Sequence, residues 1–346
     1  MKRAVFNEKS GITRREFVKS ATVGTAGLAL MNWPKAEVQA NQKYPYWGKV
    51  VVARDDSATD GPKINPQIIG PLLDEAVYAL TDGRGWKGIF PAIKPREKVA
   101  IKISSMNPGT LITHEEVLEV IVSKLMDLGA KPGNIIIFDG GPAKIASLEM
   151  ASIKRKGVRI FSTGNYAVIS SEGFDDSAKA KFPEGDTVCL SRIISDSTYL
   201  INVPVLKDHS GSGVTFSLKS HVGSVDNPGK IHRGSAFWGE IKPGSIAAIN
   251  NFRAIKEKTR LIVGDGLFGI YQGGPSGNPQ FVYNGLIVGT DPVAVDHQAR
   301  IILDEERANH RLKPLVVTHI EEASQLGVGA SPNDVKVIPL HRKKTG

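Results

Sequence analysis

Apolar residues occur along this chain both as short continuous runs and as stripes with helical spacing. The clearest unit has two such runs, KVAIKI at residues 98–103 and NIIIF at residues 134–138. Between them, apolar residues recur every three or four positions: Val117, Leu118, Ile121, Val122, Leu125 and Leu128. A strand, a helix and a second strand of this length predict a parallel pair joined by a right-handed crossover.

The ends of the predicted helices also carry signals. Thr113, followed three residues later by Glu116, has the spacing of a capping box and is predicted to cap the first helix. Gly129 is predicted to follow its last turn, because glycine readily adopts the left-handed conformation found there. Asp291 and Pro292 predict the start of another helix, with Asp as its cap and Pro in its first turn.

The same alternation continues through the chain. Further strands are predicted at residues 49–53, 158–161, 199–203, 261–263, 286–289 and 335–339, and further helices at residues 65–80, 246–256 and 291–303. The polar residues 164–186 are predicted to run over the surface. We therefore predict an α/β fold, a mainly parallel sheet flanked by helices in Rossmann-like βαβ units, in one lobe or two. This domain spans residues 41–346, with its core at residues 50–305.

The first 40 residues have a different pattern. Arg14 and Arg15 form a twin-arginine pair followed by Phe17 and Lys19, and a mildly apolar run at residues 21–31 comes next. Small residues before position 41 suit a signal peptidase. We predict a twin-arginine (Tat) signal peptide at residues 1–40, the Tat translocase as export partner and the periplasm as destination. The alternatives are an uncleaved amphipathic anchor and a chance arginine pair.

The amino-acid composition limits the classes of partner that this chain is expected to bind. Removing seven Lys and Arg and three Asp and Glu of residues 1–40 from the totals of 44 and 35 leaves a net charge of +5. The positive charge forms no block, so we expect no nucleic acid but a small anionic ligand. No later stretch is apolar enough for a stable membrane span. Cys189 is the single cysteine, which excludes an internal disulfide and an iron–sulfur cluster. Because Tat exports folded proteins, a metal or organic cofactor is expected but not identified.

The richest segment for chemistry runs from residue 202 to residue 232. It contains Asn202, Lys207, Asp208, His209, Lys219, His221, Lys230 and His232, with glycines at positions 211, 213 and 223. Glycine lets the backbone approach a ligand, and lysines beside free backbone N–H groups suit phosphate or carboxylate. We predict that Lys102, Asn202, Gly211 and Gly213 bind substrate, and that His209, Lys207 and Lys219 are catalytic.

The catalytic roles follow from ordinary side-chain chemistry. His209 is a candidate acid–base group because histidine titrates near neutral pH, and Asp208 is its candidate orienting partner. Lys207 and Lys219 are expected to bind an anion or, if desolvated, to act as a base or form a Schiff base. The alternation of apolar and polar residues at positions 214–219 predicts a strand with Lys219 on its polar face.

A metal site is the alternative use of these histidines. His209, His221 and either Asp296 or His297 are ligand types that suit a divalent metal, although no pair has close ligand spacing. The predicted metal ligands are thus His221, Asp296 and His297, and the alternative is ordinary hydrogen bonding in loops. Asp139 and Asp265 each follow an apolar strand, where ligands bind in parallel sheets and where Asp-Gly also makes tight turns.

Short motifs in this order resemble the family called domain of unknown function 362. They are VAIK at residues 99–102, LGA at 128–130, Asp139, NVPVLKDH at 202–209, VTFSLK at 214–219, Gly223, DG at 265–266, GP at 274–275 and DPVAVD at 291–296. Two positions depart from the family pattern, because Ser104 and Ser220 stand where asparagine is frequent. The cysteines of the ferredoxin-like extension of some relatives are absent. The resemblance implies the fold but no defined activity.

Two hypotheses about function follow. The first is a cell-envelope enzyme that acts on a small anionic substrate, with a site at the carboxyl edge of the sheet. The second is a non-catalytic periplasmic protein that binds a ligand or carries a cofactor. A third, an electron-transfer partner, is disfavoured because haem and cluster motifs are missing.

Overall fold

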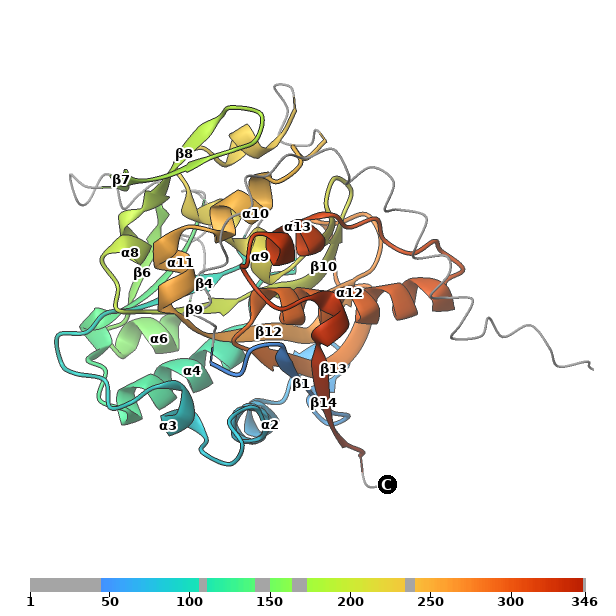
Figure 1. Cartoon of the computed structure of the whole chain (residues 1–346). Helices are drawn as coiled ribbons and strands as arrows, with labels where there is room; N and C mark the ends of the chain where they lie inside the picture. The colour runs from blue at the N-terminus through green and yellow to red at the C-terminus, as the bar shows by residue number, and fades with distance from the viewer. Residues whose placement is uncertain (1–44, 106–110, 141–149, 164–172, 234–239, 345–346) are drawn as a thin grey trace, which may run out of the picture. The chain divides into compact units, whose positions relative to one another are not determined.

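The structure, a computed structural model, describes residues 45–105, 111–140, 150–163, 173–233 and 240–344 (Figure 1). The predicted signal segment, with Arg14 and Arg15, lies outside these residues. In the described ranges no helix has the length and apolar character needed to cross a membrane.

A large mixed sheet organises the described part of the chain. Its parallel strands are β9 (Tyr199–Val203), β4 (Val99–Ile103), β5 (Ile135–Asp139) and β6 (Arg159–Ser162), in that spatial order. On the other side of β9 the sheet continues through β12 (Thr259–Ile270), β13 (Phe281–Gly289), β1 (Lys49–Asp55) and β14 (Lys336–Arg342). β13 is antiparallel to both of its neighbours, whereas β12 is parallel to β9 and β14 is parallel to β1.

Two further strands branch from this sheet and carry the candidate site. β10 (Val205–His209) is parallel to β12, and it pairs antiparallel with β11 (Gly213–Thr215). β10 follows β9 after one residue, so the chain leaves the main sheet at the carboxyl end of β9.

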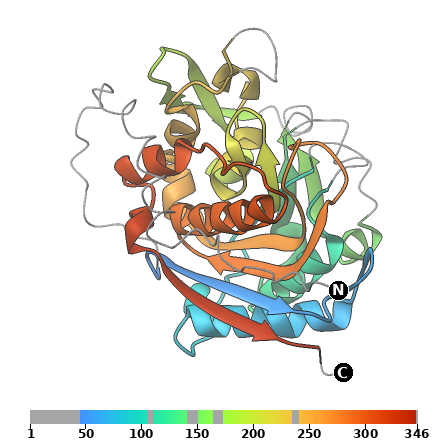
Figure 2. The ribbon, with the colours of Figure 1, turned by 90° about the vertical axis from the view of Figure 1, so that its right-hand side faces the viewer.

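Helices cover both faces of the sheet because its strands are apolar on both sides. Val99, Ile101 and Ile103 of β4 pack in one core cluster with α2 (Pro66–Leu80), α4 (Glu115–Asp127) and α6 (Ala151–Arg155). Ala100 of the same strand belongs to the cluster on the opposite face, as the period-two alternation of a strand requires. Figure 2 shows α12 (Pro292–Asn309) on one side of β12 and β13, and the blue helix α2 on the other side of the sheet.

The remaining helices and strands are short and lie between these larger elements along the chain. They are β2 (Thr59–Asp60), β3 (Lys63–Ile64), α3 (Trp86–Ile89), η2 (Pro132–Asn134), β7 (Phe174–Lys181), β8 (Thr187–Ser191), α8 (Arg192–Ser195), α9 (Ser217–Ser220), η3 (His221–Ser224), η4 (Pro228–Ile231), α10 (Ser245–Asn250), α11 (Arg253–Lys258), α13 (His319–Gln325) and η5 (Pro332–Asp334). The predicted α/β class, with a largely parallel sheet and flanking helices, is confirmed.

Helix-end predictions are confirmed at two positions and wrong at a third. Gly129 has a φ of +104° one residue beyond the cap of α4, and Asp291 accepts hydrogen bonds from the backbone N–H groups of Val293 and Ala294. Thr113 does not cap α4, because its hydroxyl donates to the Val203 carbonyl and accepts from the Ser104 N–H. It therefore ties the loop before α4 to the ends of β9 and β4.

Two segment predictions are corrected, and a third is made more specific. Residues 214–219 form the short strand β11 and then helix α9, so Lys219 is not on a strand. The helix predicted at residues 246–256 is divided into α10 and α11, because Phe252 between them has a non-helical ψ of 129°. Part of the polar excursion at residues 164–186 is the strand β7, which pairs antiparallel with β8.

Candidate functional site

The turn from β11 into α9 is fixed by contacts from two other elements. Phe216 lies over Gly264 of β12 so closely that a Cβ there would come within 2.2 Å of the ring. The buried carboxylate of Asp296, on α12, accepts hydrogen bonds from the N–H groups of Ser217 (2.7 Å) and Leu218 (3.1 Å). It thus satisfies free donors at the start of α9, as a capping side chain does. These contacts set the position of Lys219.

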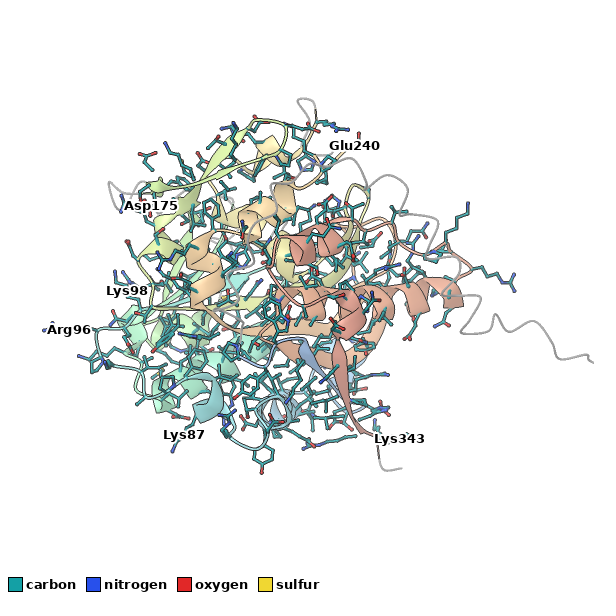
Figure 3. The ribbon with its side chains drawn as sticks, in the orientation of Figure 1. Lys87, Arg96, Lys98, Asp175, Glu240 and Lys343 are labelled. Atoms are coloured by element: carbon teal, nitrogen blue, oxygen red, sulfur yellow. The ribbon has the colours of Figure 1, made fainter. Side chains whose placement is uncertain are left out.

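Five basic side chains from this region form a buried group, which we call the cationic cluster. Its members are Lys207, His209, Lys219, His232 and His319. The charges of the other four all lower the pKa of His209, which shows that they lie around its ring. Each member is buried, with at most 8% of its surface exposed. By contrast, Lys87, Arg96 and Lys343 project from the exterior (Figure 3).

His209 is neutral in this environment. Burial first, and then the positive charges around it, lower its pKa from the usual 6.5 to about 2. Its Nδ1 accepts a hydrogen bond from the Gly211 N–H at 2.9 Å, so the ring proton is assigned to Nε2. The expectation that His209 titrates near neutral pH is therefore not met. The neutral ring presents an N–H donor instead.

Asp208 is not positioned to orient His209. Its carboxylate accepts hydrogen bonds from the N–H groups of Gly273 (3.1 Å) and Gly274 (2.7 Å), in the loop after β12. Burial raises the pKa of Asp208. Consecutive strand residues point to opposite sides, which explains why Asp208 and His209 have different partners.

Lys219 has no hydrogen-bond or ion-pair partner within the described part of the chain. Burial, followed by the charge of Lys207, lowers its pKa from 10.5 to about 7. No carboxylate contributes to that pKa. Lys207 differs, because its Nζ donates to the Leu111 carbonyl at 3.0 Å.

The two glycines predicted to bind substrate have local roles. The N–H of Gly211 is directed to His209. Gly213 has a φ of +76°, and a Cβ there would come within 2.3 Å of the Val316 carbonyl oxygen. Only glycine fits this close approach without strain.

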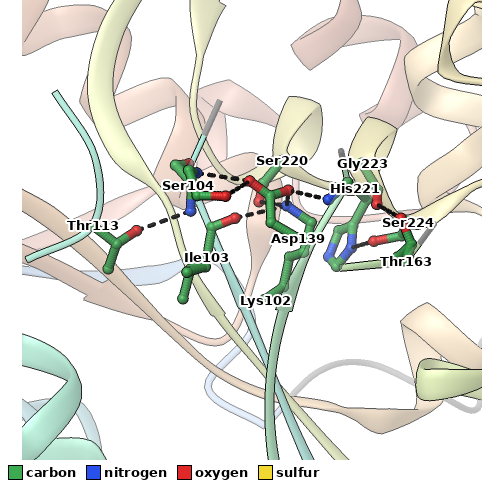
Figure 4. A network of polar contacts seen from close by, with 12 residues as sticks. Lys102, Ile103, Ser104, Thr113, Asp139, Thr163, Ser220, His221, Gly223 and Ser224 are labelled. Carbon is green, nitrogen blue, oxygen red and sulfur yellow. Dashed lines mark hydrogen bonds and ion pairs between the residues drawn. The ribbon is translucent and has the colours of Figure 1, made fainter. Parts of the chain in front are cut away.

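A second group, the paired network, surrounds the other buried lysine at the sheet edge (Figure 4). The Nζ of Lys102 lies 2.6 Å from the Asp139 carboxylate and also donates to the Ile103 carbonyl and the Ser220 hydroxyl. Asp139 accepts two further hydrogen bonds from Ser105. Gly140 and Gly223 meet so closely that a Cβ on Gly140 would come within 2.8 Å of Gly223. Lys102 and Asp139 therefore satisfy each other.

The three residues predicted to bind metal occupy different environments. His221 is buried with a pKa lowered by burial to about 3, and its Nε2 lies 3.4 Å from the Asn202 amide nitrogen. Asp296 serves the start of α9, while His297 is partly exposed. Within the described ranges, no three His, Cys, Asp or Glu side chains form a group suited to a metal ion. The side-chain amide of Asn202 donates to the Ser217 carbonyl, so Asn202 contacts the first residue of α9.

The structure also reveals a pair that the sequence reasoning missed. His114 Nδ1 lies 2.7 Å from the buried Asp265 carboxylate, which also accepts the His114 backbone N–H. Burial is the largest single effect and lowers the pKa of His114, but the charge and hydrogen bond of Asp265, together with the charge of Glu116, outweigh it and the net pKa is raised. The two residues are 151 positions apart. The sequence marks Asp265, because it follows a predicted strand, but no sequence signal marks His114, which lies directly before α4.

A large, mostly parallel sheet with helices on its faces places the chain in the class of α/β proteins. Within that class, the chain belongs to the family described as "Domain of unknown function (DUF362)", whose model matches residues 99–300. The matched range contains both the paired network and four members of the cationic cluster. A search of curated proteins finds no match to this chain.

Proposed function

We propose that this protein is an exported cell-envelope enzyme that binds a small anionic substrate at the cationic cluster. The observation that carries the proposal is Lys219, a buried amine with no partner in the described ranges, beside Lys207 and His209. Burying a charge without a partner costs free energy, and a bound anion would offset that cost.

The hydrogen-bond donors of the cationic cluster suit an anion that has one or two charged oxygens. Lys207 and Lys219 supply charge, and the Nε2–H of neutral His209 supplies a directional hydrogen bond. Charge-assisted hydrogen bonds of this kind are stronger than neutral ones. Phosphate and dicarboxylates such as oxalate have the matching chemistry.

Isothermal titration calorimetry at pH 6 with phosphate and with oxalate tests this proposal on the full chain. We expect saturable binding that Lys219→Met weakens at least about tenfold, the effect of losing one charge-assisted contact. Lys256→Met is the matched control, since Lys256 is a partly buried lysine on α11 that binds Asn251 instead. Absence of saturable binding by both anions would disprove the proposal. Binding without turnover of any substrate would favour a non-catalytic ligand-binding protein.

Export is a separate part of the proposal. We expect the double variant Arg14→Lys, Arg15→Lys to remain unprocessed in the cytoplasm, whereas the parent chain reaches the periplasm through the Tat translocase. Cell fractionation measures where each chain is located, and the mass of its N-terminal peptide shows whether the signal segment has been removed. Native mass spectrometry with elemental analysis of periplasmic protein would show whether a cofactor is bound, including a metal at His221, Asp296 and His297.

A further inference from the structure

Lys219 has the surroundings of a reactive amine. It lies in the four-residue helix α9, whose start is held by Asp296, so its backbone is fixed by a buried contact. The residue is buried, with 8% of its surface exposed. Of the other two buried lysines of this edge, Lys102 binds a carboxylate at 2.6 Å and Lys207 donates to the Leu111 carbonyl. The amine of Lys219 is therefore the one that the described contacts leave uncommitted.

We infer that Lys219 is the nucleophile of a covalent imine site, and that the substrate is a small aldehyde or ketone bearing a carboxylate or phosphate. This inference rests on the proposed anion site, because the anionic end must bind there before the carbonyl carbon reaches the amine. Lys207 supplies the positive charge for the anionic end. The Nε2–H of His209 is a donor for the carbonyl oxygen.

The chemistry balances without a further reactant. The lone pair of the Lys219 amine forms a bond to the carbonyl carbon, and the C=O π pair takes a proton to give a carbinolamine. The C–O bond then breaks and the oxygen leaves as water, so that an amine and a carbonyl become an imine and water. Only a neutral amine can begin this sequence, and Lys219 is buried without a carboxylate partner among the described residues, an environment that disfavours its charged form.

Reductive trapping tests the inference. The full chain is treated at pH 7 with glyoxylate and sodium cyanoborohydride, and peptide mass spectrometry locates N-carboxymethyl-lysine. We expect labelling at Lys219 at least about tenfold faster than at the exposed Lys87 and Lys343, because an ordinary lysine is almost fully protonated at this pH. Phosphate should suppress the labelling of Lys219 and leave that of Lys87 and Lys343 unchanged.

Two controls separate this inference from the proposed function. Lys219→Arg has no nucleophilic amine, so it should lose the label, and calorimetry with phosphate on the parent chain reports the anion site separately. Propionaldehyde, which has no anionic group, should label Lys219 more slowly than glyoxylate does. If phosphate binds but glyoxylate does not label Lys219 preferentially, the imine site is disproved and the anion site stands. If neither phosphate nor oxalate binds, the proposed function fails and the inference fails with it.

Discussion

Three lysines are buried at this edge of the sheet, and two of them, Lys102 and Lys219, differ in whether a carboxylate lies beside the amine. Lys102 is 1% exposed and has a carboxylate, a carbonyl and a hydroxyl around its amine. Lys219 is 8% exposed, and the described residues offer its amine no acceptor. The first lysine belongs to an internally compensated pair, while the second leaves its charge to be compensated by something that the chain does not supply. Burial alone therefore does not distinguish a structural lysine from a candidate functional one, but the partner does.

The largest effect is expected at the compensated lysine. Lys102→Met leaves the Asp139 carboxylate buried without its cation, and breaking such a pair costs about 3–5 kcal/mol of unfolding free energy. Urea denaturation at pH 7 measures this loss. The double variant Lys102→Met, Asp139→Leu removes both charges and should recover a large part of it. A loss below about 1 kcal/mol in the single variant would show that the pair is not the basis of the contrast.

Replacing Lys219, the lysine without a carboxylate partner in the described ranges, should stabilise the chain rather than destabilise it. The pKa of Lys219 is about 7 in the folded chain and 10.5 in the unfolded one, so between these values the unfolded chain binds more protons. The contribution of Lys219 therefore makes the unfolding free energy of the parent chain rise with pH from about 7 to 10.5. Below pH 7 this contribution is at its most unfavourable. Lys219→Met should therefore raise the unfolding free energy by a few kcal/mol at pH 6, with a gain that disappears above pH 10.5.

Urea denaturation of both chains at pH 6, 8 and 10 would follow this gain. Lys256→Met provides the comparison, because burial lowers the pKa of Lys256 but its amine binds Asn251. If Lys219→Met destabilised the chain as Lys102→Met does, a hidden partner of Lys219 would have to exist. The contrast between the two lysines would then be lost.

Local patterns in the sequence predicted the elements but not the contacts between them. The strands at residues 99–103 and 135–139 and helix α4 follow from runs and stripes that a short window contains. Residues 214–218 alternate as a strand would, yet the chain turns into α9 because Asp296, far along the sequence, accepts its first N–H groups. The pair of His114 and Asp265 could not be predicted for the same reason, because the two residues are far apart in the sequence.

The candidate site was predicted in part for the same reason. Lys207, His209 and Lys219 lie together because one segment carries all three, and residue type alone suggested an anion. Their protonation could not be predicted, since it depends on burial and on His319, which comes from another helix. Nor could the sequence show that Lys102 has Asp139 as its partner, while Lys219 has no such carboxylate in the described ranges.

The smallest expected effect is a change in the pKa of His209, and measuring it tests the cationic cluster directly. Because burial and positive neighbours hold the pKa of His209 at about 2, its ring should stay neutral from pH 8 down to pH 4 in NMR spectra of the ligand-free chain. A bound anion reverses the sign of the nearest charge and favours the protonated ring. Saturating phosphate should therefore raise the pKa of His209 by about 1–3 units, and phosphate should bind more tightly as the pH falls. The NMR signals of the exposed ring of His310, which contacts Glu306, should be the same with and without phosphate at each pH. An unchanged His209 in the presence of bound phosphate would place the anion elsewhere, and the uncommitted amine of Lys219 would then need a different explanation.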